Sequence, residues 1–212
     1  MNTKLGLKNH LLNNIVKYYD SKLKIHGPNY KGVDWNSLSS QSLRFKKILK
    51  IIKRKETNFS LLDYGCGYGA LYHYMNGLYN QFQYTGYDIS NEMIFKAKEM
   101  DLKAKCKWYT HLDNKIKFDY VLSSGIFNVK MNFSEEVWKD YITNTLEEIN
   151  SISNKGFSFN MLSNLAEKKR REKKLYYADP VYFFDYCSNY FSQQIELLDN
   201  YSLYEFTIIV RK

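Results

Sequence analysis

The sequence contains few of the residues that build disulfide scaffolds and metal centres. There are 3 cysteines and 4 histidines among 212 residues. Cys66, Cys106 and Cys187 form no close pair, and neither they nor the histidines show a metal-ligand spacing. A disulfide framework and a zinc site are therefore not expected, and we assign no metal ligand.

Long apolar runs and prolines are also scarce. The N-terminus lacks the uninterrupted apolar stretch of a signal peptide, and no later segment approaches the ~18 apolar residues of a membrane helix. We therefore expect a cytoplasmic protein without a membrane span. The 2 prolines, Pro28 and Pro180, lie at the boundaries of predicted helices.

The chain contains enough apolar residues for a core, and it carries an excess of positive charge. The hydrophobic fraction of 44% over 212 residues suits one globular domain. A formal net charge of +9 favours nucleic acid, phosphorylated small molecules or acidic membranes as partners without choosing among them. The dense basic run at residues 168–174 is either a solvated helix face or a flap that attracts phosphate.

The pattern of apolar residues changes near residue 56. Before it, helical spacing predicts two helices, at about 7–25 and 40–52. After it, short apolar runs alternate with helical segments: strands are expected at 59–64, 82–88, 105–109, 118–123 and 156–161, and helices at 70–78, 91–100 and 135–152. We expect an N-terminal helical lid over 1–56 and a catalytic domain over 57–212, within one globular unit.

The last part of the chain follows a different pattern. A helix begins at Pro180, and two apolar strands follow at 194–198 and 204–210. The turn between these strands is too short for a crossover helix, so they must be antiparallel. The predicted fold class is α/β: a Rossmann-like, seven-stranded mixed sheet, parallel except for a C-terminal antiparallel hairpin, with helices on both faces.

A glycine-rich loop, residues 63–69 (Asp-Tyr-Gly-Cys-Gly-Tyr-Gly), connects the first predicted strand to a helix. Glycines let a ligand approach the backbone closely, and the following helix offers free N–H groups. Asp88 closes the next strand, nineteen residues beyond Gly69, where a carboxylate can accept both hydroxyls of a ribose. NAD and S-adenosylmethionine sites share such an acid, so Asp88 does not separate them.

Three features favour S-adenosylmethionine over a dinucleotide. Two helices precede the first strand, Asp63 would repel a pyrophosphate, and the chain ends in a hairpin. Residues 61–71 resemble the first motif of the class I S-adenosylmethionine-dependent methyltransferases, 86–90 the second, and 118–125 the motif of the fourth strand. The resemblance covers about residues 58 to 212.

This resemblance implies S-adenosyl-L-methionine as cofactor. The glycine loop would pack under its methionine and ribose portions, Asp88 would hold the ribose hydroxyls, and Ile89 and Met93 would sandwich the adenine. The chain departs from the family after the third strand, where residues 108–111 (Trp-Tyr-Thr-His) contain no acid to receive the adenine amino group. Thr110 or a backbone carbonyl would then make that contact. The complete predicted cofactor set is Arg44, Asp63, Gly65, Cys66, Gly67, Gly69, Asp88, Ile89, Met93, Tyr109, Thr110, Ser123 and Ser124.

The segments 32–35 and 40–45 are predicted to cover the cofactor. Arg44 either pairs with the methionine carboxylate through a bidentate contact or lies on a solvated helix face. Methyl transfer needs in-line positioning and exclusion of water, and a base only for some acceptors, so no catalytic residue is assigned. The candidates for a catalytic role are His26, Asn128, Lys130, Tyr177 and Glu205.

The acceptor is the least defined part of the prediction. Residues 123–130 contain no Asn-Pro-Pro-Tyr-like box, which disfavours a nucleobase or amide nitrogen. The segments that flank these motifs, residues 26–45, 124–130, 175–180 and 204–207, resemble a small bacterial group of methyltransferases associated with glycan and secondary-metabolite pathways. We therefore expect O-methylation of a small polar or anionic acceptor: a sugar, a sugar nucleotide or a phosphate-bearing surface-polysaccharide precursor. The alternatives are an RNA methyltransferase and a non-catalytic cofactor-binding protein.

Overall fold

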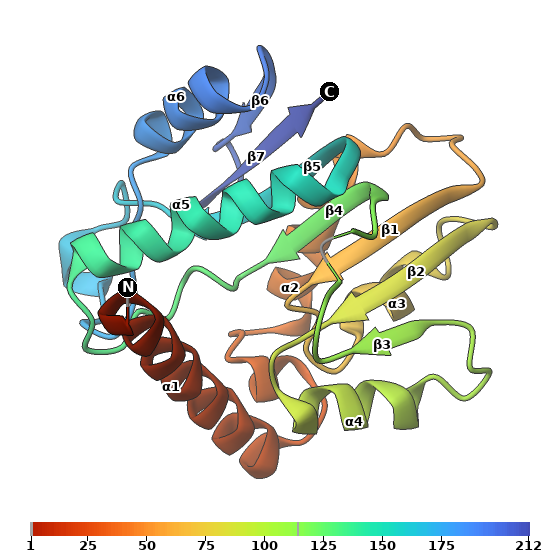
Figure 1. The fold of residues 1–212 in the computed structure, drawn as a ribbon, viewed down its shortest axis with the longest axis horizontal. Coiled ribbons are helices and arrows are strands. Elements are labelled where there is room, and N and C mark those ends of the chain that lie inside the picture. Colours follow the sequence, from red (N-terminus) through yellow and green to blue (C-terminus); the bar gives the residue numbers. More distant parts are fainter. Residues whose placement is uncertain (1, 114) are drawn as a thin grey trace.

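Seven strands form a single mixed sheet in the order β3-β2-β1-β4-β5-β7-β6 (Figure 1). The computed structural model describes residues 2–113 and 115–212. The strands are β1 (Phe59–Tyr64), β2 (Phe82–Tyr87), β3 (Lys107–Tyr109), β4 (Phe118–Ser124), β5 (Ser153–Leu162), β6 (Gln194–Leu198) and β7 (Glu205–Arg211). β1 to β5 pair in parallel, and β7 is antiparallel to both β5 and β6, so the predicted fold class is confirmed.

Helices cover both faces of this sheet. One face packs against α5 (Glu135–Ile152) and α6 (Pro180–Tyr190), and the other against α2 (Leu38–Ile48), α3 (Ala70–Met75) and α4 (Asn91–Met100). Their starts follow local sequence rules: Ser37 forms a capping box with Ser40, and Asp179 caps α6 directly before Pro180. No helix among residues 2–113 and 115–212 is long and apolar enough to cross a bilayer.

Two segments differ from their predicted secondary structure: the start of the third strand and the basic run. The third strand begins at Lys107 and not at 105, because the N–H groups of Lys105 and Cys106 donate to the carboxylate of Asp101. The basic run does not form a helix face: only Lys168–Arg170 makes a single 3-10 turn, and the rest connects β5 to α6 in extended and turn conformations.

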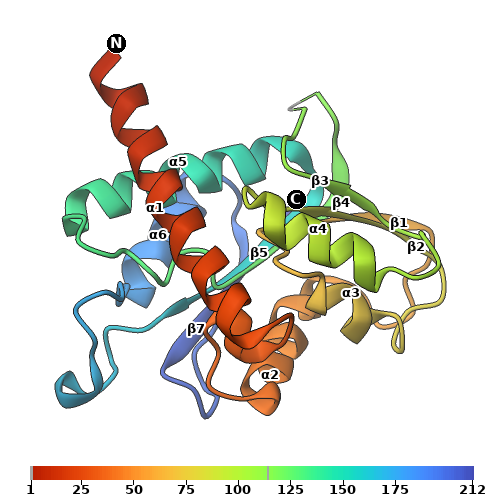
Figure 2. The same cartoon turned by 90° about the horizontal axis from the view of Figure 1, so that it is seen from below.

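The N-terminal helix α1 (Asn2–His26) lies across the carboxyl ends of the parallel strands (Figures 1 and 2). Leu11 and Ile15 are buried in the same core as α5, which fixes the middle of α1 against the sheet. A short 3-10 helix, η1 (Tyr30–Val33), then returns the chain toward α2. Residues from α1, η1 and α2 thereby meet the edge of the sheet where the glycine loop lies.

Candidate cofactor and active site

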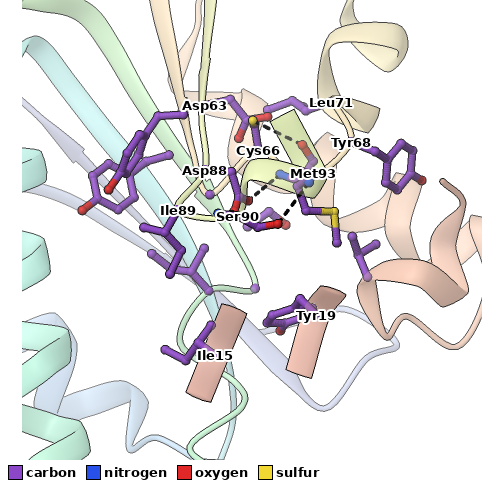
Figure 3. Close-up of a pocket in the computed structure, with 18 of the residues that line it drawn as sticks. Ile15, Tyr19, Asp63, Cys66, Tyr68, Leu71, Asp88, Ile89, Ser90 and Met93 are labelled. Carbon is purple, nitrogen blue, oxygen red and sulfur yellow. Dashed lines mark hydrogen bonds between the residues drawn. The ribbon is translucent and has the colours of Figure 1, made fainter. Parts of the chain in front are cut away.

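A cavity opens where β1, β2 and β4 end, between the glycine loop and α1 (Figure 3). One wall consists of Asp63 and the glycine loop, and the adjoining wall of residues 87–90 with Met93. Because all these strands are parallel, their carboxyl ends meet at one edge, which is the usual ligand site of an open α/β sheet.

The glycine loop adopts a conformation that other residues would strain. Gly65 has φ +80° and Gly69 has φ +85°, both in the left-handed region. A Cβ atom on Gly65 would lie 2.2 Å from Cγ2 of Ile126, and one on Gly69 would lie 2.6 Å from the ring of Trp108. These two glycines therefore fit because neighbouring side chains occupy the space beside them.

Hydrogen bonds between the glycine loop and the end of β2 hold the loop in place. The N–H groups of Gly65 and Cys66 donate to the carbonyl of Tyr87 at 2.7 and 2.9 Å. The N–H of Gly67 donates to Oδ2 of Asp88 at 2.8 Å, and the N–H of Ser90 donates to Oδ1 at 2.9 Å. The carboxylate of Asp88 thus connects the loop to the start of α4 and lines the cavity.

Asp63 is buried and Asp88 is half-buried, and desolvation changes the protonation of both carboxyl groups. Desolvation raises the pKa of Asp63 to about 7, although the hydroxyl of Tyr84 donates a hydrogen bond to it. Desolvation likewise raises the pKa of Asp88 to about 6, against the backbone donors of Ser90 and Gly67. A ligand that brings positive charge or hydroxyl donors would therefore stabilise both ionised carboxylates.

The opposite side of the cavity comes from α1 and the segment before α2. Ile15, Val16 and Tyr19 of α1 line it, together with Val33 and Trp35. The Trp35 ring occupies the position that a Cβ on Gly125 would take, 2.4 Å from the nearest ring atom. The remaining wall includes Tyr64, Tyr87 and Tyr141, and the Tyr64 and Tyr87 ring centroids are 4.9 Å apart.

These aromatic hydroxyls remain protonated near neutral pH. Desolvation raises the pKa of Tyr87 to about 12, and it also raises the pKa values of Tyr19, Tyr64 and Tyr141. They can donate hydrogen bonds to a ligand, but they are poor bases. The cavity therefore combines a polar cradle with an aromatic and aliphatic enclosure.

The profile of a methyltransferase domain family matches residues 39–196 of this chain. The chain belongs to this methyltransferase family. It is also 40% identical over 155 residues to "Putative methyltransferase Rv1506c" of Mycobacterium tuberculosis (strain ATCC 25618 / H37Rv), a match that covers 73% of this chain and 93% of the relative. Together with the glycine cradle, these matches make the chain an S-adenosylmethionine-dependent methyltransferase.

Solved structures share the fold over nearly the whole length of this chain. The magnesium protoporphyrin IX methyltransferase of Synechocystis PCC 6803 with bound S-adenosylhomocysteine superposes with a TM-score of 0.65 at 14% identity, covering 99% of each chain. A DhpI complex with S-adenosylmethionine gives a TM-score of 0.67 at 12% identity, covering 95% of this chain and 98% of that chain. At such identities the likeness concerns the fold.

Most of the predicted cofactor residues line the methyltransferase cavity. Those that do are Asp63, Gly65, Cys66, Gly67, Asp88, Ile89, Met93 and Ser124. Gly69 lies behind the loop as the N-cap of α3, and Ser123 is buried one residue before the cavity edge. Tyr109 lies on a separate surface groove with His111, and Thr110 is not in contact with the cavity either.

Arg44 forms a buried ion pair with Glu205, and its contact with a methionine carboxylate stays a prediction. Its Nε donates to both carboxylate oxygens of Glu205 at 2.9 and 2.8 Å, and its Nη2 donates to Oε1 at 2.5 Å. The guanidinium also stacks 4.0 Å above the ring of Trp35, which lines the cavity, whereas Arg44 itself is not among the lining residues. Both charged groups are buried, which rules out a solvated helix face.

The catalytic candidates are dispersed around the methyltransferase cavity and do not line it. Glu205 is held by Arg44, and Asn128 accepts the N–H of Leu162 through Oδ1 at 3.1 Å. Lys130 donates to the carbonyl of Phe133, and Tyr177 accepts the N–H of Glu172. The remaining candidate, His26, is exposed at the end of α1.

Several aromatic wall residues are absent from the predicted cofactor set, among them Tyr19, Trp35 and Tyr141. Trp35 lies in the segment 32–35, which was predicted to cover the cofactor, but no role was predicted for its side chain. Tyr19 and Tyr141 belong to amphipathic helices, where one tyrosine cannot be distinguished from the others by spacing alone.

Proposed function

We propose that this methyltransferase transfers the methyl group of S-adenosylmethionine to a hydroxyl oxygen of a small molecule. The observation that carries this proposal is the cavity between the glycine loop and α1, whose wall includes Tyr19 and Trp35. Such an enclosure excludes water and positions two reactants, which is most of what methyl transfer requires.

The chain's own residues suggest how the cofactor is held. Asp88, Ile89 and Met93 line the cavity: the carboxylate of Asp88 would accept ribose hydroxyls, and Ile89 and Met93 would flank the adenine. The glycine loop lets the methionine portion approach bare backbone, and Asp63 is the nearby acid for its positive charge. When bound, the cofactor supplies an electrophilic methyl on a sulfonium, and it leaves as S-adenosylhomocysteine.

The acceptor oxygen would attack the methyl carbon while the carbon–sulfur bond breaks and the hydroxyl proton passes to water or a base. Among the cavity-lining residues that the structure describes, the only acidic side chains are Asp63 and Asp88, and the rest of the wall is mainly aromatic and aliphatic. We therefore propose that the reacting hydroxyl enters the cavity. Any anionic part of a sugar nucleotide or polysaccharide precursor would lie near Lys22 and Lys174, which pair with Asp34 between the wall residues Val33 and Trp35.

An RNA acceptor is the second candidate, supported by the net charge of +9. The position of α1 favours the small molecule, because Ile15, Val16 and Tyr19 cover one side of the cavity and leave less room for a long chain. Methylation assays with labelled cofactor, comparing sugars and sugar nucleotides with total RNA, separate the two acceptor classes.

Calorimetric titration with S-adenosylmethionine and S-adenosylhomocysteine tests the cofactor half of the proposal. We expect micromolar binding of both and at least tenfold weaker binding to Asp88→Ala, since a ribose would lose its acceptor carboxylate. Glu99→Gln on the exposed side of α4 is the matched control and should bind like the wild type. Equal binding by Asp88→Ala, or preferential binding of NAD, would contradict the proposed site.

A further inference from the structure

We propose that Tyr18, Lys22, Asp34 and Lys174 form an ionic latch that holds α1 over the cavity and sets the rate of cofactor exchange. The inference rests on the proposed function, because it takes the cavity to be the cofactor site. It assigns a positioning role to Asp34 and to one lysine of the basic run. None of these four residues lines the cavity itself.

The latch joins three separate segments through one carboxylate. Lys22 Nζ lies 2.7 Å from Oδ1 of Asp34, and the hydroxyl of Tyr18 donates to Oδ2. Lys174 Nζ lies 3.7 Å from the same Oδ2 and donates to the Tyr18 hydroxyl at 3.2 Å. Asp34 therefore connects α1 to the turn before α2 and to the segment that follows β5.

Two of the four latch residues, Asp34 and Tyr18, stand beside residues of the cavity wall. Val33 and Trp35 flank Asp34, and both line the cavity; Tyr18 precedes Tyr19, which also lines it. The rings of Tyr18 and Tyr19 are 5.3 Å apart and nearly perpendicular. A displacement of Asp34 or of α1 would therefore move the wall that faces the glycine loop in Figure 3.

The backbone at Asp34 adopts a conformation that few residues tolerate. Its φ of 60° and ψ of 32° place it in the left-handed region, which aspartate and asparagine tolerate better than most residues. Its N–H donates to the carbonyls of Lys31 and Tyr30 and ends η1. Strained conformations of this kind persist where the surroundings hold them, and here the latch contacts do so.

Solvent exposure distinguishes the latch from the other ion pair near the cavity. The side chains of Lys22, Asp34 and Lys174 are 26%, 23% and 37% exposed, so water can solvate them when the latch opens. Arg44 and Glu205 are 6% and 0% exposed, and separating them would leave buried charges unpaired. Opening is therefore expected at the latch, with the Arg44 side of the wall staying in place.

Stopped-flow binding of S-adenosylhomocysteine, followed by tryptophan fluorescence, tests the latch. Asp34→Asn keeps a residue that tolerates the left-handed conformation and removes the charge. We expect the association and dissociation rate constants to rise together by roughly three- to tenfold, as the loss of two partly exposed ion pairs implies, while Kd changes by less than about twofold. Lys174→Met should act in the same direction, and Lys174→Arg should restore slow exchange.

Glu196→Gln is the matched control, because it breaks the similarly exposed pair with Arg211 in the C-terminal hairpin. Rates for Asp34→Asn and Lys174→Met equal to those of this control would overturn the latch. A weaker Kd with an unchanged association rate would also overturn it, because that result indicates direct ligand binding. Absence of any binding to the wild type would instead refute the proposed function on which the latch rests.

Discussion

Arg44 and Glu205 form a buried, bidentate ion pair between α2 and β7, although 161 positions separate them in the sequence. The pair joins the helical segment before β1 to the last strand of the sheet. It also supports the cavity indirectly, because the Arg44 guanidinium stacks on Trp35 and Trp35 lines the cavity. The N-terminal segment and the C-terminal hairpin are therefore coupled at the active site.

Removal of one partner of this pair should destabilise the protein strongly. Glu205→Gln leaves the Arg44 guanidinium buried without a counter-ion, and we expect the free energy of unfolding to fall by about 3–5 kcal/mol in urea denaturation. The double variant Arg44→Met with Glu205→Leu removes both charges, so its free energy of unfolding should fall by less than that of the single variant. A single variant as stable as the wild type would contradict the buried pairing.

A side chain on the glycine loop should be costly where the space is filled. For Gly69→Ala, a Cβ at 2.6 Å from the Trp108 ring and a left-handed backbone predict a loss of about 1–3 kcal/mol in the free energy of unfolding. Gly77→Ala is the matched control, because no atom lies within 4 Å of its Cβ position. Similar stabilities for the two variants would argue against the close packing of the loop on β3.

Cofactor affinity should fall in acid. Burial raises the pKa of Asp63 to about 7 and that of Asp88 to about 6, so the free protein takes up protons in this range. A cofactor that stabilises the ionised carboxylates must displace these protons, and its Kd should therefore rise as the pH falls from 8 through 7 to 5.5. Titrations in buffers of different ionisation enthalpy measure the released protons, and a pH-independent Kd would contradict this linkage.

Asp63 should also affect stability with a defined sign. Its pKa is about 7 when folded and about 4 when unfolded, so the native state binds more protons between these values. Its contribution to stability is therefore present below pH 4 and is lost as the pH rises toward 7. Asp63→Asn, which has no such titration, should gain in Tm relative to the wild type from pH 5 to pH 8 in calorimetry. A difference in Tm that stays the same from pH 5 to pH 8 would indicate that the ionised Asp63 carboxylate is less buried than in this structure.

Local signals were enough to predict the sheet and the cradle. The glycine loop, Asp88 and the strand pair after Pro180 each follow from short-range rules for turns, helix starts and connection length. These rules predicted seven strands in a mixed sheet and a cofactor site at the ends of β1 and β2, and the fold class is confirmed.

Only the tertiary structure decided which polar and aromatic side chains meet. Arg44 was an exposed or ligand-binding residue by its local sequence, and its partner Glu205 becomes a neighbour only when α2 packs beside β7. Lys174 belonged to an undivided basic run until its distance to Asp34 distinguished it. Local propensity governs backbone conformation over a few residues, whereas burial and charge pairing depend on segments that chain folding brings together.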